Sequence, residues 1–286
     1  MIRLLLVSLI WASSFGLIKT RLANLDPAAV AVLRLAAALA VFAPFLRPRL
    51  IPAALRVRLA AIGAVQFGVM YLLYLRSYAF LGAYQVALFT IATPLWVVLL
   101  DAAVVRRWRL RYGLAALLSI VGAAAVVAGH GIGSALFRGF VLVQLSNLCF
   151  AAGQVAWRFE RTRLDAGIPD KAVFGWLYVG ALVLSAAYSG AATRWSAFSP
   201  NPVQWATMAY LGVLASGAGF FWWNQGATRV NAGTLAAFNN AKIPLGIASS
   251  VVLFGESADW PRLLASGLFM GAAVWVAERP DRRMFS

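Results

Sequence analysis

The chain has 286 residues, of which 62% are hydrophobic and 12% charged, and its mean hydropathy is +0.80. Soluble domains carry about 25% charged residues, so the composition excludes a soluble domain and predicts an integral membrane protein. The formal charge of +16 does not indicate a nucleic-acid partner, because the basic residues are spread among many loops and are not gathered on one soluble face.

In chain order, apolar runs recur along the whole sequence, each long enough to cross a hydrocarbon core of about 30 Å as a helix. The first run begins at Met1, and no small-residue cleavage site is followed by a soluble domain, so we expect a retained helix rather than a removed signal peptide. The sequence predicts an all-α integral membrane protein with ten transmembrane helices, at residues 2–22, 27–46, 59–80, 84–104, 112–130, 139–157, 172–192, 204–226, 233–254 and 262–278.

The basic residues of the loops predict the orientation in the membrane. With a cytoplasmic N-terminus, the loops on that side hold seventeen Lys and Arg, and the opposite side holds five. This excess satisfies the positive-inside rule and predicts that both termini are cytoplasmic, in a bacterial inner membrane. The seventeen are Arg3, Arg47, Arg49, Arg56, Arg58, Arg106, Arg107, Arg109, Arg111, Arg158, Arg161, Arg163, Lys171, Arg229, Arg279, Arg282 and Arg283; the five are Lys19, Arg21, Arg138, Arg194 and Arg262.

Ten helices divide into two halves of five, at residues 1–134 and 135–286. An odd number of crossings in each half means that the second half enters the membrane from the opposite side, which predicts an inverted repeat. The clearest internal match sets "ATPLWVVLLDAAVV" against "KIPLGIASSVVLF" and aligns Pro94 with Pro244. A helix rich in small residues then closes each half, at Gly122 and at Gly271.

Two stretches carry a resemblance to a known family. "IWASSFGLIKTRLANLDPAAVAVLRLAAALAVF" has a Trp and small residues in the first span, a Lys at its end, a Pro opening the second span, and Arg34 within it. "PLGIASSVVLFGES" ends in a Gly-Glu pair, where the first half has Val105 and Arg106 instead. The chain thereby resembles the EamA-like branch of the drug/metabolite transporter superfamily. Its size, aromatic content and ninth-span Lys make it most similar to YddG-type aromatic amino acid exporters.

This resemblance implies a central cavity between the two halves, lined by spans 1, 3, 4, 6, 8 and 9, and a structural role for Arg34. It also implies a transporter that works by alternating access around a site near the midplane.

Lys242 lies about ten residues into the ninth span, near the midplane. A charge in hydrocarbon is costly and normally faces a cavity or a partner. Leu235, Phe238 and Asn239 share its helix face, and Pro244 frees backbone carbonyls at a similar level. Three interpretations stay open: a buried structural charge held by carbonyls and amides, a cation that binds a substrate carboxylate, or a side chain that extends to the interface, which the depth disfavours.

Further candidates lie on the other spans that the resemblance assigns to the cavity. Aromatic residues there also serve as interfacial belts or packing, and amide side chains also join helices by hydrogen bonds, so these alternatives remain open. The expected substrate-binding residues are Trp11, Ser14, Tyr74, Tyr78, Phe89, Trp96, Asn147, Gln154, Trp223, Phe238, Asn239 and Lys242.

Asp101 is the only carboxylate well inside a span, and we expect it to pair with Arg106. Small multidrug resistance proteins, distant relatives within the superfamily that this chain resembles, exchange protons for cationic drugs through a Glu in the first span. The corresponding stretch "WASSFG" has no acid, so the resemblance disfavours a cation/proton exchanger. His130 is the only histidine, and we find no acid/base pair at a common depth, no metal-ligand pair and no phosphate loop. The sequence therefore predicts no enzyme, no cofactor and no metal site.

The expected function is an exporter or facilitator of small metabolites, with an aromatic or hydrophobic amino acid as substrate. Without a midplane carboxylate to carry protons, we expect transport down the substrate gradient. The alternatives are phosphorylated metabolites or other drug-like solutes, and a membrane sensor that does not transport. The expected partners are the small-molecule substrate and the lipid bilayer, and a monomer is compatible with the sequence.

Overall fold

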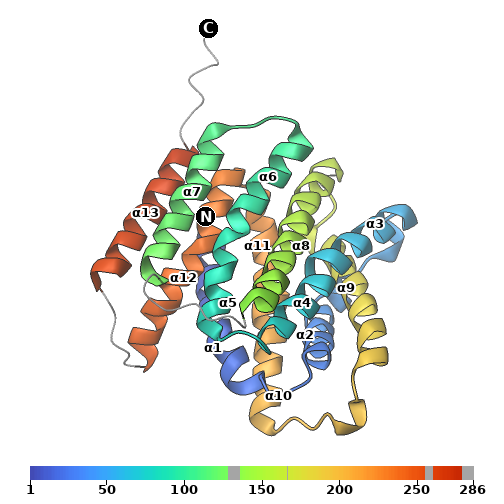
Figure 1. Cartoon of the computed structure of the whole chain (residues 1–286). Helices are drawn as coiled ribbons and strands as arrows, with labels where there is room; N and C mark the ends of the chain where they lie inside the picture. Colours follow the sequence, from blue (N-terminus) through green and yellow to red (C-terminus); the bar gives the residue numbers. More distant parts are fainter. Residues whose placement is uncertain (128–135, 166, 255–259, 279–286) are drawn as a thin grey trace.

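The computed structural model describes residues 1–127, 136–165, 167–254 and 260–278, and these residues form helices joined by short connections, with no strand among them. The helices pack side by side in one bundle, in which α7 and α13 lie next to each other at one edge (Figure 1). A helical segment lies at each of the ten predicted positions.

Some predicted spans are single α-helices and others are composite. The single helices are α2 (Pro27–Phe42), α7 (Leu110–Val127), α8 (Leu136–Arg163), α9 (Asp170–Ala192), α12 (Ala232–Phe254) and α13 (Trp260–Glu278). The composite spans are α1 (Ile2–Leu17) with η1 (Ile18–Leu22), α3 (Ala53–Gly63) with η4 (Ala64–Val69) and α4 (Met70–Ser77), α5 (Ala83–Phe89) with η5 (Thr90–Ala92) and α6 (Thr93–Val105), and α10 (Pro202–Tyr210) with η7 (Leu211–Ala218) and α11 (Gly219–Ala227).

Six of these segments are long and apolar enough to cross a bilayer. They are Ile2–Leu22, Pro27–Phe45, Ala53–Ser77, Gln85–Val105, Phe137–Arg163 and Asp170–Ala192, and shorter apolar helices run over Leu110–Gly122 and Leu264–Glu278. The fold is therefore that of an all-α protein with several membrane crossings. The full count of ten crossings and their inverted repeat remain predictions.

Local sequence explains where several helices begin. Asp26 precedes Pro27, and its carboxylate accepts a hydrogen bond from the Ala29 N–H at 2.9 Å. Asn201 and Gln204 form a reciprocal capping box around Pro202 at the start of α10. These caps satisfy N–H groups that have no partner within the helix, and proline at the first helical position loses no hydrogen bond.

Close helix packing depends on glycine at the contact between α3 and α9. A Cβ atom placed on Gly63 would lie 1.9 Å from the Leu177 carbonyl oxygen, and one on Gly180 would lie 1.9 Å from the Ala60 carbonyl oxygen. No side chain fits at either point. In contrast, nothing lies within 4 Å of a Cβ on Gly190, further along α9.

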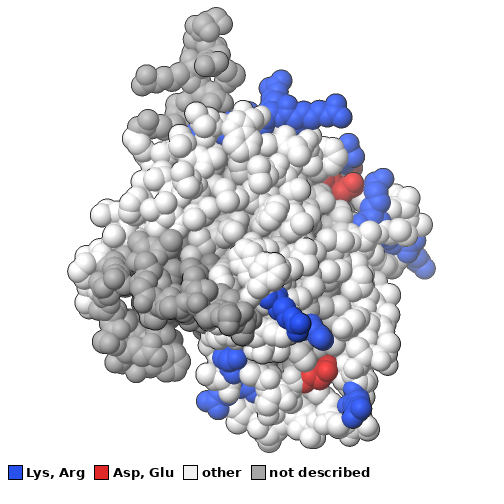
Figure 2. All heavy atoms as spheres, viewed as in Figure 1, with Lys and Arg blue, Asp and Glu red and all other residues white. Residues whose placement is uncertain are grey.

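The surface is that of a protein that faces lipid. Large apolar side chains such as Leu99, Leu117, Val183 and Leu268 are exposed, which a water-soluble monomer avoids over large continuous areas. On the face shown in Figure 2, Lys and Arg atoms lie over the turn between α6 and α7, near α3 and lower down, with a few Asp and Glu atoms beside them, whereas the middle of this face is mostly white.

The ion pairs differ from the sequence prediction. Asp101 does not pair with Arg106: it accepts a hydrogen bond from Nη1 of Arg158 at 2.8 Å, and Arg158 also donates to the Val230 carbonyl at 3.2 Å. Arg106 is exposed and closes α6 in a left-handed conformation, with φ of 54°. The prediction was wrong because α8 continues to Arg163, which brings Arg158 against α6.

Candidate functional site

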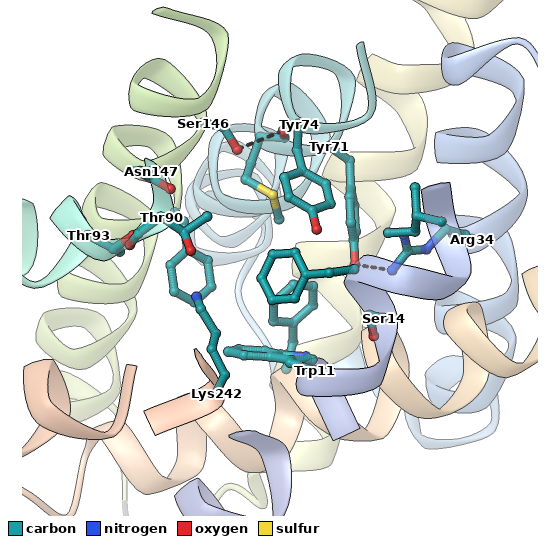
Figure 3. A pocket seen from close by; sticks show the side chains of 15 residues that line it. Trp11, Ser14, Arg34, Tyr71, Tyr74, Thr90, Thr93, Ser146, Asn147 and Lys242 are labelled. Atoms are coloured by element: carbon teal, nitrogen blue, oxygen red, sulfur yellow. Dashed lines mark hydrogen bonds between the residues drawn. The ribbon is translucent and has the colours of Figure 1, made fainter. Parts of the chain in front are cut away.

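A cavity lies between α1, α2, α4, η5, α6, α8, α11 and α12, and it holds about 600 Å³ of empty space, part of it open to the outside (Figure 3). Its lining residues are Trp11, Ser14, Phe15, Ile18, Arg34, Met70, Tyr71, Tyr74, Thr90, Thr93, Ser146, Asn147, Phe150, Phe220 and Lys242.

One side of the cavity is a cluster of aromatic rings around Trp11. Its ring centroid lies 5.9 Å from that of Phe150, 5.0 Å from Phe220 and 4.9 Å from Trp223. The Trp11 indole N–H donates to the Ala215 carbonyl at 2.9 Å, which fixes the orientation of the ring. The aromatic cluster continues through Phe67, which stacks on Phe220 at 4.6 Å. These rings give the cavity a rigid apolar surface.

Lys242 reaches into the cavity from α12 and is 8% exposed (Figure 3). Its ammonium donates a long hydrogen bond of 3.4 Å to the Asn239 amide oxygen and lies 5.9 Å from the centre of the Trp11 ring. An ammonium has three donors. No Asp or Glu is among the described residues that line the cavity, so within this part of the chain Lys242 lacks a counter-charge there.

Arg34 is the second cation of the lining and is only 2% exposed. Its Nη2 donates to the Tyr71 hydroxyl at 2.9 Å and to the Ser216 hydroxyl at 3.2 Å, and the guanidinium stacks over the Tyr71 ring at 4.4 Å. These bonds join α2, α4 and η7, as expected of a structural residue. Arg34 also contributes to the cavity wall, which the resemblance did not imply.

Four polar side chains form another part of the wall: Thr90, Thr93, Ser146 and Asn147 (Figure 3). Each is at least nine-tenths buried, and each donates to a backbone carbonyl. The bonds run from Thr90 to Ala87 at 2.7 Å, from Thr93 to Thr90 at 2.7 Å, from Ser146 to Met70 at 3.2 Å and from Asn147 to Phe89 at 3.0 Å. We call these four side chains the acceptor wall.

The structure brings five of the twelve predicted residues together at the cavity, namely Trp11, Ser14, Tyr74, Asn147 and Lys242. The other seven are not in its lining: Tyr78, Phe89, Trp96, Gln154, Trp223, Phe238 and Asn239. Three of these seven directly support lining residues. The Tyr78 hydroxyl bonds that of Tyr74 at 2.8 Å, the Phe89 carbonyl accepts from Asn147, and Asn239 accepts from Lys242.

The remaining four are held by packing or by other hydrogen bonds. Trp96 donates to Gln144 at 3.3 Å, Trp223 donates to Gln154 at 3.2 Å, and the Phe238 carbonyl accepts from Ser8 at 3.0 Å. The side chains of Trp96, Gln154 and Trp223 thus bond to neighbouring helices, and Phe238 packs against the hydrophobic core.

Residue spacing missed several lining residues. Phe150 and Phe220 look like ordinary apolar positions in their spans. Thr90 and Ser146 look like the small hydroxyl residues that membrane helices commonly use for packing. Pro94 in the fourth span was a usable signal. The α-helix gives way to a 3-10 turn, η5, just before this proline. Asn240 donates to the Ile91 carbonyl in this turn at 3.1 Å.

Comparison with known proteins decides the family. The model of the EamA-like transporter family matches residues 1–129 and again residues 133–277. The chain belongs to the EamA-like transporter family. The expected family is thus confirmed, and the protein is a membrane transporter of small metabolites.

Several curated relatives of this EamA-like transporter are full-length matches. A "Probable biotin transporter" of Pseudomonas aeruginosa is 36% identical over 280 residues, covering 96% of each chain. The "Biotin transporter" proteins of Salmonella typhimurium and of Escherichia coli K12 are each 34% identical over 275 residues, covering 96% of this chain and 91% of theirs. None of these names refers to the YddG type or to aromatic amino acids, so the relatives do not support that part of the prediction.

A solved crystal structure has the same fold, with a TM-score of 0.75 at 18% identity over 97% of this EamA-like transporter and 96% of the other chain. At this identity the likeness concerns the fold alone. The arrangement of helices in Figure 1 is therefore one that a crystal structure also displays.

Proposed function

We propose that this EamA-like transporter moves a small, largely apolar molecule that carries a carboxylate, and that biotin is its substrate. Biotin joins a pentanoate carboxylate to a compact sulfur ring fused to a neutral urea. The molecule thus has one anionic end, an apolar body and no ammonium group. The names of the relatives support this choice, and the chemistry of the cavity supports it independently.

The observation that carries the proposal is that the buried charge of Lys242 is poorly compensated within the cavity. It is a buried cation whose hydrogen bond in the protein is long, at 3.4 Å, and none of the described residues that line the cavity around it is an acid. A charge at this depth is costly unless it is compensated. A substrate carboxylate supplies both the missing charge and the missing hydrogen-bond acceptors.

The same observation disfavours an aromatic amino acid. A zwitterion brings an ammonium together with its carboxylate, so its net charge is zero. Arg34 and Lys242 already place two cations in the lining, and the part of the lining that the structure describes has no carboxylate to pair with the ammonium of a zwitterion. A monoanion such as biotin compensates one of the two cations and introduces no new one.

Alternating access explains how two predicted substrate-binding residues that lie outside the cavity, Gln154 and Asn239, could still meet the substrate path. Gln154 and Asn239 are almost fully buried, and each keeps an amide nitrogen without a hydrogen-bond partner. Such groups cost free energy when they stay unpaired. We infer that the cavity extends to these amides when the transporter opens on its other side, which gives them a partner.

Transport by purified protein in liposomes tests the proposal. Liposomes loaded with unlabelled biotin should take up labelled biotin faster than protein-free liposomes, because exchange needs no driving force and does not depend on direction. Unlabelled biotin should compete, whereas phenylalanine, tryptophan and a sugar phosphate should compete at least about tenfold less well, a difference of about 1.4 kcal/mol.

Three results would contradict the proposal. Stronger competition by the amino acids would favour an aromatic amino acid as substrate, and stronger competition by the sugar phosphate would favour phosphorylated metabolites. Binding of biotin without any exchange would favour a sensor that does not transport.

A further inference from the structure

We propose that the acceptor wall of Thr90, Thr93, Ser146 and Asn147 is a second subsite, which binds the neutral N–H groups of the substrate. This inference rests on the proposed function and deepens it. It states that the substrate needs a urea or amide in addition to its carboxylate, and it assigns the residues that select for that group.

The assignment follows from which hydrogen-bond donors and acceptors of the wall are already in use. A hydroxyl has one hydrogen to donate and two lone pairs to accept with. Thr90, Thr93 and Ser146 each use their hydrogen on a backbone carbonyl, at 2.7, 2.7 and 3.2 Å. What they offer to a ligand is therefore lone pairs.

Asn147 adds an amide oxygen to the same wall. A carbonyl only accepts hydrogen bonds, so the group that Asn147 turns to the Phe89 carbonyl at 3.0 Å must be its amide nitrogen. Gln144 donates to the same carbonyl at 2.9 Å, so both amides are anchored there. The amide oxygen of Asn147 remains for a donor from the cavity.

The chemistry of the wall excludes several ligand groups. A carboxylate or phosphate at the wall would either face these lone pairs or draw the hydroxyl hydrogens away from the backbone carbonyls that they now bond. An ammonium would be attracted to the oxygens but would add a cation to a lining that already holds Arg34 and Lys242. A neutral N–H donor satisfies the oxygens and leaves the charge unchanged.

The division of the cavity matches a substrate with two different polar groups. Lys242 extends from α12 in the direction of the acceptor wall, and the aromatic rings around Trp11 border the same space (Figure 3). One substrate carboxylate, one apolar body and one set of N–H donors would use all three surfaces. Biotin has these three parts.

The test compares biotin with lipoate, which lacks the urea, and with dethiobiotin, which keeps it. Lipoate has the same pentanoate carboxylate on a five-membered sulfur ring but no N–H donor, whereas dethiobiotin keeps the urea and loses the sulfur ring. The variant is Thr90→Val combined with Thr93→Val, which keeps side-chain shape and removes two acceptors. Exchange and ligand-induced thermal stabilisation are both measured, the second because it reports binding without transport.

The matched control is Thr207→Val. Thr207 is buried in α10, donates to the Val203 carbonyl at 2.7 Å as the wall threonines do to theirs, and does not line the cavity. The control should leave both substrates unaffected. The double variant should lose about tenfold or more for biotin and dethiobiotin, as expected for donors left without acceptors, and less than about twofold for lipoate.

The outcomes separate the two proposals. A double variant that keeps the preference for biotin over lipoate, or that loses both substrates equally, overturns the acceptor wall and leaves biotin transport intact. A wild-type protein that exchanges and binds lipoate as well as biotin also overturns the wall. A wild-type protein that neither exchanges nor binds biotin overturns both proposals.

Discussion

Replacement of Lys242 by glutamine removes one buried charge from the cavity and keeps a side chain of similar length. The ammonium is 8% exposed and has one long hydrogen bond to Asn239 and a Trp11 ring at 5.9 Å, so two of its three donors are free for a ligand. A hydrogen bond to a charged group contributes about 1.5–3 kcal/mol. Lys242→Gln should therefore weaken biotin transport about 10- to 100-fold.

The assay is exchange in liposomes with biotin and biotin amide, which differ in the charge of one end. Wild-type protein should prefer biotin, and Lys242→Gln should lose this preference because the amide never used the charge. Lys171→Gln is the matched control, since this exposed lysine lies 4.5 Å from the Phe45 ring and outside the cavity lining.

Two results would refute this reasoning. Normal transport by Lys242→Gln would mean that the charge is structural. An equal loss for biotin and biotin amide, in a variant that inserts and unfolds like the wild type, would mean that Lys242 shapes the cavity but does not bind the carboxylate.

Three further predictions concern topology, coupling and packing. In a Cys149→Ala background, a cysteine placed at Pro52 or Asp165 should not react with an impermeant thiol reagent in intact cells, because the arginine-rich loops are predicted to be cytoplasmic. Labelling of either position would contradict the predicted orientation. An imposed pH gradient should not concentrate biotin inside liposomes, because the described lining of the cavity has no carboxylate to carry a proton; concentrative uptake would show proton coupling. Gly180→Ala should destabilise the protein by about 1–3 kcal/mol through overpacking and lower its unfolding temperature in detergent. Gly190→Ala on the same helix should not, since only a Cβ on Gly180 would meet a backbone oxygen at 1.9 Å. Equal unfolding temperatures of the two variants would contradict the packing.

Composition and periodicity predicted the helices well because each apolar run must satisfy its own backbone within a bilayer. The boundaries were less accurate. The third span begins at Ala53 and not at residue 59, so Arg56 and Arg58 lie within α3. Charged side chains at the ends of membrane helices can reach the polar interface, so a charge does not mark the end of a helix.

The position of Lys242 was also predictable, because a cation in the middle of an apolar span normally faces a cavity or a partner. Its surroundings were not. The pairing of Asp101 with Arg158, and the bond between Gln154 and Trp223, depend on which helices meet and at what height. Residue spacing on one helix carries no information on that.

The acceptor wall shows most clearly what a sequence leaves out. Thr90 and Ser146 donate their hydrogens to Ala87 on the same span and to Met70 on another, and only the three-dimensional arrangement reveals that lone pairs remain for the cavity. The aromatic residues are the opposite case. Their abundance suggested an aromatic substrate, yet rings such as Phe67 and Trp223 pack against other rings.

A structure of the protein in a lipid nanodisc with saturating biotin tests the central claim most directly. The account predicts biotin inside the cavity, with its carboxylate at hydrogen-bond distance from Nζ of Lys242, about 2.7–3.2 Å, and its urea against the acceptor wall. A cavity that stays empty under saturating biotin, or biotin bound elsewhere on the protein, would contradict it.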